Sequence, residues 1–192
     1  ARFNSPEYIP MSFHINAACW NHYDQEALKD LCEERPLLFP DYQRPKGKVA
    51  PSYAANQRAD QPYTDPWGCR WETSEDGITG AVTGHPLADW EALETYKAPS
   101  PDETNGIYPI DWDCVAENVA LVRKRGGMVQ GGLPHGHTFL RLQDIRGYEN
   151  LIFDMMDGHP KLPKLIDMVA DFNERLIMKW MAFEPQWMSY PE

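Results

Sequence analysis

The sequence predicts an α/β fold, because segments with strand-like and helix-like patterns alternate along the chain. The clearest step is a helix that opens at Asp111 and ends at Gly126 and Gly127, followed at once by a buried strand over residues 128–131. A long amphipathic helix is expected close to the C-terminal end, with one apolar face that can pack against the strands. Alternation of this kind favours parallel strands with helices packed outside them.

The first part of the chain, residues 8–35, predicts one strand and one helix. Residues 8–16 form a short apolar run that alternates around Phe13 and Ile15, as a strand does. Asp24 can cap a helix over residues 25–35, which stops before Pro36 because proline cannot continue it.

The middle part, residues 41–109, predicts long loops with an inserted hairpin. Four prolines interrupt residues 41–66, and an irregular stretch of that length is usually functional or disordered. Residues 69–73 and 78–83 predict two strands joined by the turn sequence SEDG. A short helix is expected over residues 87–96.

The last part, residues 111–183, predicts a helix, a strand and further helices. The final helix carries one apolar stripe. Its members are Leu162, Leu165, Ile166, Val169, Phe172, Leu176, Ile177 and Trp180. We therefore expect residues 1–192 to form a single domain built from these three parts.

Composition excludes several classes of partner. The formal net charge of −11 would repel phosphate backbones and anionic lipids, so we expect no nucleic-acid or membrane binding. No apolar run reaches the roughly 18 residues that a membrane span needs. The sequence opens without a secretory signal pattern, and its four cysteines are scattered, so we expect reduced thiols and a cytoplasmic location.

Four stretches carry motifs in a distinctive serial order. They are IPMSFHINAACW (9–20), DPWGCRWETSEDGITGAVTGHPLADWEAL (65–93), GGMVQGGLPHGHTFLRLQDIRGYENLIFDMMDGHPKL (126–162) and the helix that follows. Together they resemble the uroporphyrinogen decarboxylase superfamily. The D-x-W-G block followed by a Gly-rich hairpin and H-P-L-x-D-W is similar to its methyltransferase-like and uncharacterised branches.

The resemblance implies that this chain is the N-terminal part of a (β/α)8 TIM-type barrel with an inserted β-hairpin and long loops. A complete barrel has about 250 residues, so this single, incomplete barrel domain would need the remainder of the barrel or a homodimer partner. The active site would lie at the C-terminal ends of the strands. No metal ligands are expected in this segment, because the zinc ligands of the methyltransferases would fall after Glu192.

Three functions follow from the resemblance. The first is methyl transfer from a corrinoid protein to a thiol or pterin-like small-molecule acceptor, with zinc as the cofactor. The second is decarboxylation of uroporphyrinogen or a related carboxylated substrate without a cofactor. The decarboxylases carry an Arg-rich first-strand motif, and the corresponding FHINAACW has no Arg, so this is the weaker hypothesis. The third is a non-catalytic half-barrel that needs a partner chain.

His14 and Asp65 are the candidate catalytic residues. His14 ends the first expected strand, where barrel chemistry takes place, with Asn16 as a substrate contact beside it; the alternative is a histidine bonded for packing. Asp65 is the nearest match to the catalytic aspartate of the family, with Trp67 and Arg70 as substrate contacts. The alternative is that Asp65 only starts a turn and Trp67 packs in the core.

Two histidines and two arginines complete the candidate substrate-binding set. His135 and His137 follow the second clear strand as the sequence H-G-H. They are expected to line a pocket; the alternative is that they bind a metal, which their irregular backbone surroundings make the weaker hypothesis. Arg141 and Arg146 could grip a carboxylate or phosphate. The alternative is an internal ion pair with a nearby acid, and the candidates are Asp144, Glu149 and Asp154.

Overall fold

The computed structural model describes residues 13–40 and 42–192. The chain divides into two compact units, and each is described here by itself. Unit 1 comprises residues up to Gln61 together with Thr73–Gly80, and unit 2 comprises Pro62–Glu72 and Ala81–Glu192. The single incomplete domain expected from the sequence stays a prediction.

Unit 1 is built on two short helices and a 3-10 turn. They are α1 (Cys19–His22), α2 (Gln25–Glu34) and η1 (Ala55–Gln57). The Asp24 side chain accepts the N–H of Ala27 at 2.8 Å and so caps α2, which confirms the expected helix and its start.

The strand expected over residues 8–16 is wrong for the part that the structure describes. Residues 13–16 belong to no helix or strand, and residues 8–12 lie outside the described residues. The Asn16 side chain accepts the N–H of Ala18 at 2.8 Å, which turns the chain into α1. A local side-chain bond therefore replaces the strand pairing that the apolar alternation suggested.

A three-stranded antiparallel sheet opens unit 2. Its strands are β1 (Tyr63–Thr64), β2 (Arg70–Glu72) and β3 (Ala81–Gly84), in the order β1-β2-β3. Pairing of β2 with β3 confirms the expected hairpin, although its strands are shorter than the pattern suggested. The expected helix over residues 87–96 is a 3-10 helix, η2 (Trp90–Glu94).

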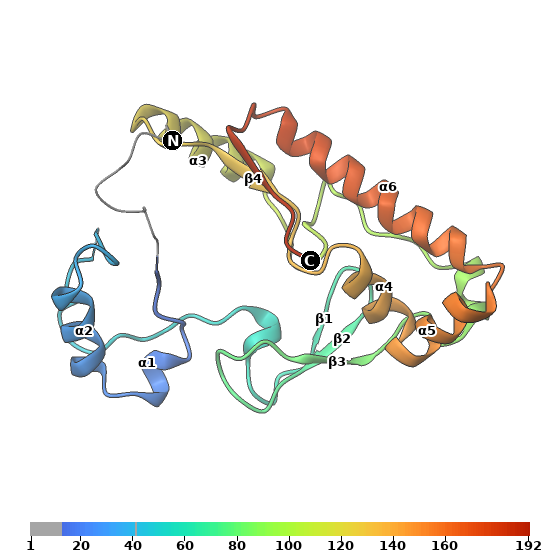
Figure 1. The fold of residues 1–192 in the computed structure, drawn as a ribbon, viewed down its shortest axis with the longest axis horizontal. Helices are drawn as coiled ribbons and strands as arrows, with labels where there is room; N and C mark the ends of the chain where they lie inside the picture. Colours follow the sequence, from blue (N-terminus) through green and yellow to red (C-terminus); the bar gives the residue numbers. More distant parts are fainter. Residues whose placement is uncertain (1–12, 41) are drawn as a thin grey trace. The chain divides into compact units, whose positions relative to one another are not determined.

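The rest of unit 2 alternates helices with two parallel strands. The expected strand over residues 128–131 is displaced toward Gly132, and Met128 is exposed. β4 and β5 pair in parallel and lie side by side next to α6 (Figure 1). The elements are α3 (Trp112–Lys124), β4 (Gln130–Gly132), α4 (Phe139–Arg146), α5 (Tyr148–Asp157), α6 (Leu162–Met181) and β5 (Trp187–Ser189).

The described residues therefore form an α/β structure with two small sheets, and no closed barrel is present among them. Both helices that the sequence marks most strongly are present. Asp111 caps α3 by accepting the N–H groups of Asp113 and Cys114, as its position suggested.

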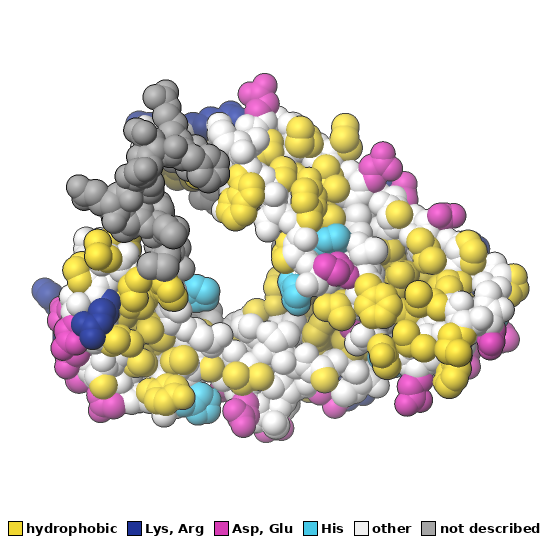
Figure 2. Space-filling model, viewed as in Figure 1, with side chains coloured by type: hydrophobic (Ala, Val, Ile, Leu, Met, Phe, Trp, Pro, Cys, Tyr) yellow, Lys and Arg dark blue, Asp and Glu magenta, His cyan; other side chains and the backbone are white. Residues whose placement is uncertain are grey.

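Figure 2 shows apolar side chains gathered over α4 and α5, and the exposed ones include Tyr148 and Met156. No helix in the described ranges is long and apolar enough to cross a membrane.

One face of α6 forms the centre of the unit 2 core. Leu165 and Leu176 are fully buried, and the ring of Phe172 meets that of Trp67 edge-on at 5.0 Å between centroids. Ile166 is 41% exposed, so the buried face of α6 is narrower than the apolar stripe that the sequence predicted. The buried face is what holds this 20-residue helix in place.

Truncation of one core leucine tests this arrangement. We expect Leu165→Ala to lower the free energy of unfolding by about 2–5 kcal/mol, because it leaves a cavity in a fully buried site. Ile166→Ala on the exposed side is the matched control and should cost less than about 1 kcal/mol. Urea unfolding followed by circular dichroism measures both, and equal losses would contradict the assignment of the buried face.

Candidate functional site

The carboxyl ends of β4 and β5 lie together in unit 2. Beyond the paired strands, the N–H of Leu133 donates to the Ser189 carbonyl at 3.0 Å, and that of Gly136 donates to the Pro191 carbonyl at 3.1 Å. The loop that carries the H-G-H sequence therefore runs beside the segment that follows β5. In α/β proteins, ligands bind at this edge of a parallel sheet.

His137 and Glu192 meet at this edge. The Nε2 atom of His137 lies 3.6 Å from a carboxylate oxygen of Glu192, and the two side chains are 14% and 40% exposed. The ring of Tyr190 stands edge-on to the imidazole at 6.5 Å. We call His137, Thr138, Tyr190 and Glu192 the strand-end site.

Hydrogen bonds hold His137 from two sides. Its Nδ1 atom lies 2.6 Å from the hydroxyl oxygen of Thr138, a contact whose direction depends on the tautomer of the ring. The Asn173 side chain on α6 donates to the His137 carbonyl at 2.8 Å, which ties the loop to the helix. The imidazole thus has a fixed backbone and a polar group near each ring nitrogen.

The Glu192 carboxylate lies at the first turn of α4. It accepts backbone N–H groups from Thr138 at 3.1 Å, from Leu140 at 3.2 Å and from Phe139. Partial burial acts to raise the pKa of Glu192, but these three donors and His137 outweigh it and bring the pKa below its ordinary value. The carboxylate is therefore ionised beside the imidazole at neutral pH.

The two histidines of the H-G-H sequence have different surroundings. His135 is exposed, whereas His137 is mostly covered. Within residues 13–40 and 42–192, no group of three His, Cys, Asp or Glu side chains could hold a metal ion. The described part of the chain thus offers no fit for zinc, and the expectation of ligands after Glu192 stays a prediction.

Asp65 is buried and fully engaged. One carboxylate oxygen accepts the N–H groups of Trp67 and Cys69 at 2.9 Å each. The other accepts the Trp71 indole at 3.0 Å and the Arg141 guanidinium at 2.7 Å, and the Asp65 side chain has no exposed area. Asp65 therefore shapes the turn into β2, which is the alternative that the sequence left open, and its catalytic role stays a prediction.

The arginines of α4 also face inward. The Arg141 guanidinium lies 2.7 Å from the Asp65 carboxylate and 3.8 Å from that of Asp144. Arg146 binds Asp154 at 2.6 Å, donates to the Leu87 and Ala88 carbonyls, and lies over the Trp90 ring at 4.5 Å. Both guanidinium groups are buried in internal ion pairs, which is the alternative that the sequence left open, and a role in substrate binding stays a prediction.

The remaining candidates divide between buried and exposed positions. Trp67 is buried against Phe172 as a core residue. Arg70 is exposed and pairs with Glu72 at 2.7 Å along β2. Asn16, in unit 1, starts the turn into α1.

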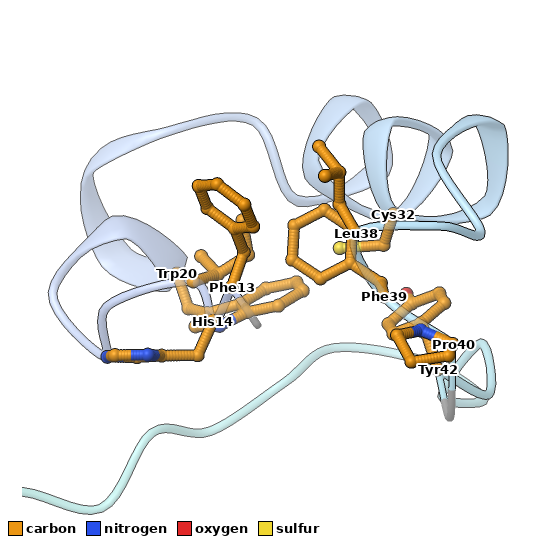
Figure 3. A pocket seen from close by; sticks show the side chains of 9 residues that line it. Phe13, His14, Trp20, Cys32, Leu38, Phe39, Pro40 and Tyr42 are labelled. Atoms are coloured by element: carbon orange, nitrogen blue, oxygen red, sulfur yellow. The ribbon is translucent and has the colours of Figure 1, made fainter. Parts of the chain in front are cut away.

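His14 lies in unit 1, on the segment before α1. It contributes to two neighbouring hollows, of about 320 and 450 Å³, and Asn16 lines the larger one. In Figure 3 the imidazole of His14 is directed away from Leu38, Phe39 and Tyr42. The structure thus places His14 at a pocket, while its catalytic role stays a prediction.

Sequence reasoning missed Glu192, Tyr190 and Asn173. The strand that positions the first two is only three residues long and has little alternation. A weak signal was present, because Pro185 follows the helical region and the apolar pair Trp187 and Met188 comes soon after it. Asn173 lies in a helix, and nothing in its spacing marks a contact with a loop 36 residues earlier.

Comparison with known proteins adds no relative. No protein family, no curated protein and no solved structure matches this chain. The resemblance to the uroporphyrinogen decarboxylase superfamily therefore stays a prediction that rests on the four quoted stretches.

The Arg146–Asp154 pair gives a test of the inward-facing arginines. Burial acts to raise the pKa of Asp154, but hydrogen bonds from Arg146 and Trp90 prevail and lower it. We expect Arg146→Met to cost about 3–5 kcal/mol, because it leaves the carboxylate buried without its partner. The exposed pair of Arg175 with Asp171 is the control, and Arg175→Met should cost at most about 1 kcal/mol in urea unfolding. Similar losses for the two variants would contradict the structural role.

Asp144 gives a test that depends on pH. Burial is the main cause that raises its pKa from 3.8 to about 6, so the folded state binds this proton more tightly than the unfolded state. The stabilisation from protonation is therefore complete below pH 3.8 and lost as the pH rises through 6. The wild type loses this stabilisation as the pH rises from 3.8 through 6, whereas Asp144→Asn has no such carboxyl group. The free energy of unfolding of the variant should therefore rise relative to that of the wild type by up to about 3 kcal/mol over this pH range.

Urea unfolding at several pH values measures this gain. Asp171→Asn, on the exposed face of α6, is the control and should show no comparable change with pH. A difference between Asp144→Asn and the wild type that stays constant from pH 4 to pH 7 would contradict the raised pKa.

Proposed function

We propose that this chain is part of an enzyme of the uroporphyrinogen decarboxylase superfamily that transfers a methyl group from a corrinoid protein to a thiol or pterin-like acceptor. The observation that carries the proposal is the meeting of His137 and Glu192 at the carboxyl ends of two parallel strands. Enzymes built on such strands place their chemistry at this edge. The four quoted stretches supply the class of reaction.

His137 is proposed as the proton acceptor of the strand-end site. As the acceptor sulfur or nitrogen takes the methyl group, it loses a proton, and an imidazole nitrogen can receive it. The ionised carboxylate of Glu192 lies 3.6 Å from the Nε2 atom of the ring. The contact with Thr138 constrains the orientation of the ring.

Decarboxylation of a carboxylated porphyrinogen is the less supported hypothesis. Such a substrate needs several accessible cations, and Arg141 and Arg146 are both occupied in buried pairs. The half-barrel that needs a partner chain also stays a hypothesis. Among the described strands, β4 and β5 pair only with each other, which leaves sheet edges that a partner or further chain could cover.

The proposal includes a cytoplasmic location. It is supported by the chemistry of the four cysteines, all of which are free thiols, with Cys114 exposed. Free thiols of this kind persist in a reducing compartment.

A methyl-transfer assay tests the proposal. The full product of the coding frame that contains these residues is supplied with methylcobalamin, as a surrogate for the corrinoid protein, and with a simple alkyl thiol. Loss of the methylcobalamin absorbance under anaerobic conditions reports transfer. We expect His137→Ala to lower the rate by about 10²–10⁴-fold, because a positioned proton acceptor contributes that much.

Matched variants show whether His137 acts specifically. His135→Ala removes the exposed neighbour and should change the rate less than about threefold. Retention of the wild-type rate in His137→Ala would exclude the proposed role. An inactive wild type that instead releases CO₂ from uroporphyrinogen would replace methyl transfer by decarboxylation.

A further inference from the structure

Unit 1 contains an aromatic pocket that the proposed function does not use. It has a volume of about 320 Å³, and four aromatic rings line it: Phe13, Trp20, Phe39 and Tyr42 (Figure 3). The other side chains of the wall are His14, Ile15, Cys32, Leu38 and Pro40. Ligand pockets span about 300–1,000 Å³, so this one suits a small molecule of one or two rings.

The wall comes from separate segments that are held together. Trp20 belongs to α1 and Cys32 to α2, whereas Phe13 and Leu38 lie on the segments before and after them. The Gln25 side chain accepts the N–H of Val49 at 2.8 Å. It also donates to the Trp20 carbonyl at 2.6 Å and to the Val49 carbonyl at 3.0 Å, and these bonds fix α2 within unit 1. The pocket is therefore part of an ordered arrangement and not one isolated turn.

The pocket carries no carboxylate, ammonium or guanidinium group in its lining, and the imidazole of His14 is directed away from Leu38, Phe39 and Tyr42 (Figure 3). Burial is the main cause that raises the pKa of Tyr42 and also that of Cys32, so the hydroxyl and the thiol both stay neutral at pH 7. A ligand with a formal charge would lose its hydration here without gaining an ionic partner. The surroundings therefore favour an uncharged ligand.

One polar group in the wall is left without a partner. The Tyr42 hydroxyl is buried and has no hydrogen bond among the described residues. A buried hydroxyl without a partner is destabilising, and a ligand atom that accepts its hydrogen would recover part of that cost. The oxygen is covered, so a ligand reaches it through a rotamer change of a side chain in the wall, an adjustment that is common on binding.

We propose that this pocket binds an uncharged planar compound of one or two fused rings that carries a hydrogen-bond acceptor. The aromatic walls supply stacking and edge-to-face contacts, which stabilise a bound ring beyond the burial of its surface. Tyr42 supplies the polar contact. The inference concerns unit 1 alone and does not rest on the methyl-transfer proposal, which concerns unit 2.

Quinoline is a suitable probe, because it is planar, uncharged near pH 7.5 and has one acceptor nitrogen. We expect saturable binding to the full chain by calorimetry, with a dissociation constant below about 1 mM. Leu38→Trp should fill the pocket and weaken binding at least tenfold. Leu37→Trp is the matched control, because Leu37 is 69% exposed and lies outside the pocket, and it should bind within twofold of the wild type.

Two comparisons test the chemistry without filling the pocket. Tyr42→Phe should bind quinoline three- to tenfold more weakly, since the hydroxyl donor is lost. 2-Naphthoate has the same two-ring shape with a negative charge and should bind the wild type at least tenfold more weakly than quinoline. Circular dichroism confirms that each variant remains folded.

Several results would overturn the proposal. Absence of saturable quinoline binding up to 10 mM (about tenfold above the expected limit) would exclude the ligand class. Equal affinity of the Leu38→Trp and Leu37→Trp variants, both folded, would place binding elsewhere. Binding of 2-naphthoate as tight as that of quinoline would show that the site does not select an uncharged ring.

Discussion

Helix α4 is held against the rest of unit 2 by the buried ion pair between Asp65 and Arg141. Charges removed from water are stabilising only when every remaining polar atom is satisfied. Asp65 meets this condition through two backbone N–H groups, an indole and the guanidinium. The pair joins the turn before β2 to a helix 76 residues later, so the start of α4, where Glu192 binds, depends on it.

The inward arginines explain why α4 is hard to recognise in the sequence. A helix of a globular domain usually shows its buried side as an apolar stripe. In α4 that side includes Arg141, Asp144 and Arg146, so buried charges interrupt the pattern. Their partners lie on other elements, and only the folded structure brings Asp65 and Asp154 to them. Periodicity therefore could not have placed α4 or assigned its arginines to internal pairs.

The parts that the sequence predicted well have local causes. Asp24 and Asp111 cap the helices that follow them through bonds that span two or three residues. The hairpin of β2 and β3 is likewise a contact between near neighbours. By contrast, β4 and β5 are three residues each and pair across 57 positions, so their existence depends on the helices between them. The strand expected near His14 was wrong where it is described, because an equally local hydrogen bond from the Ala18 N–H to the Asn16 side chain prevailed.

The strand-end site depends on a glycine that neither charge nor apolar periodicity marks. At Gly132 the backbone has a φ of +152°, and a Cβ atom built there would lie 2.1 Å from the Ser189 carbonyl oxygen. Any side chain would therefore push the end of β4 away from β5. The H-G-H loop starts just beyond this point, so the contact of His137 with Glu192 requires that approach. Backbone proximity, more than the choice of histidine or glutamate, thus determines whether the two groups can act together.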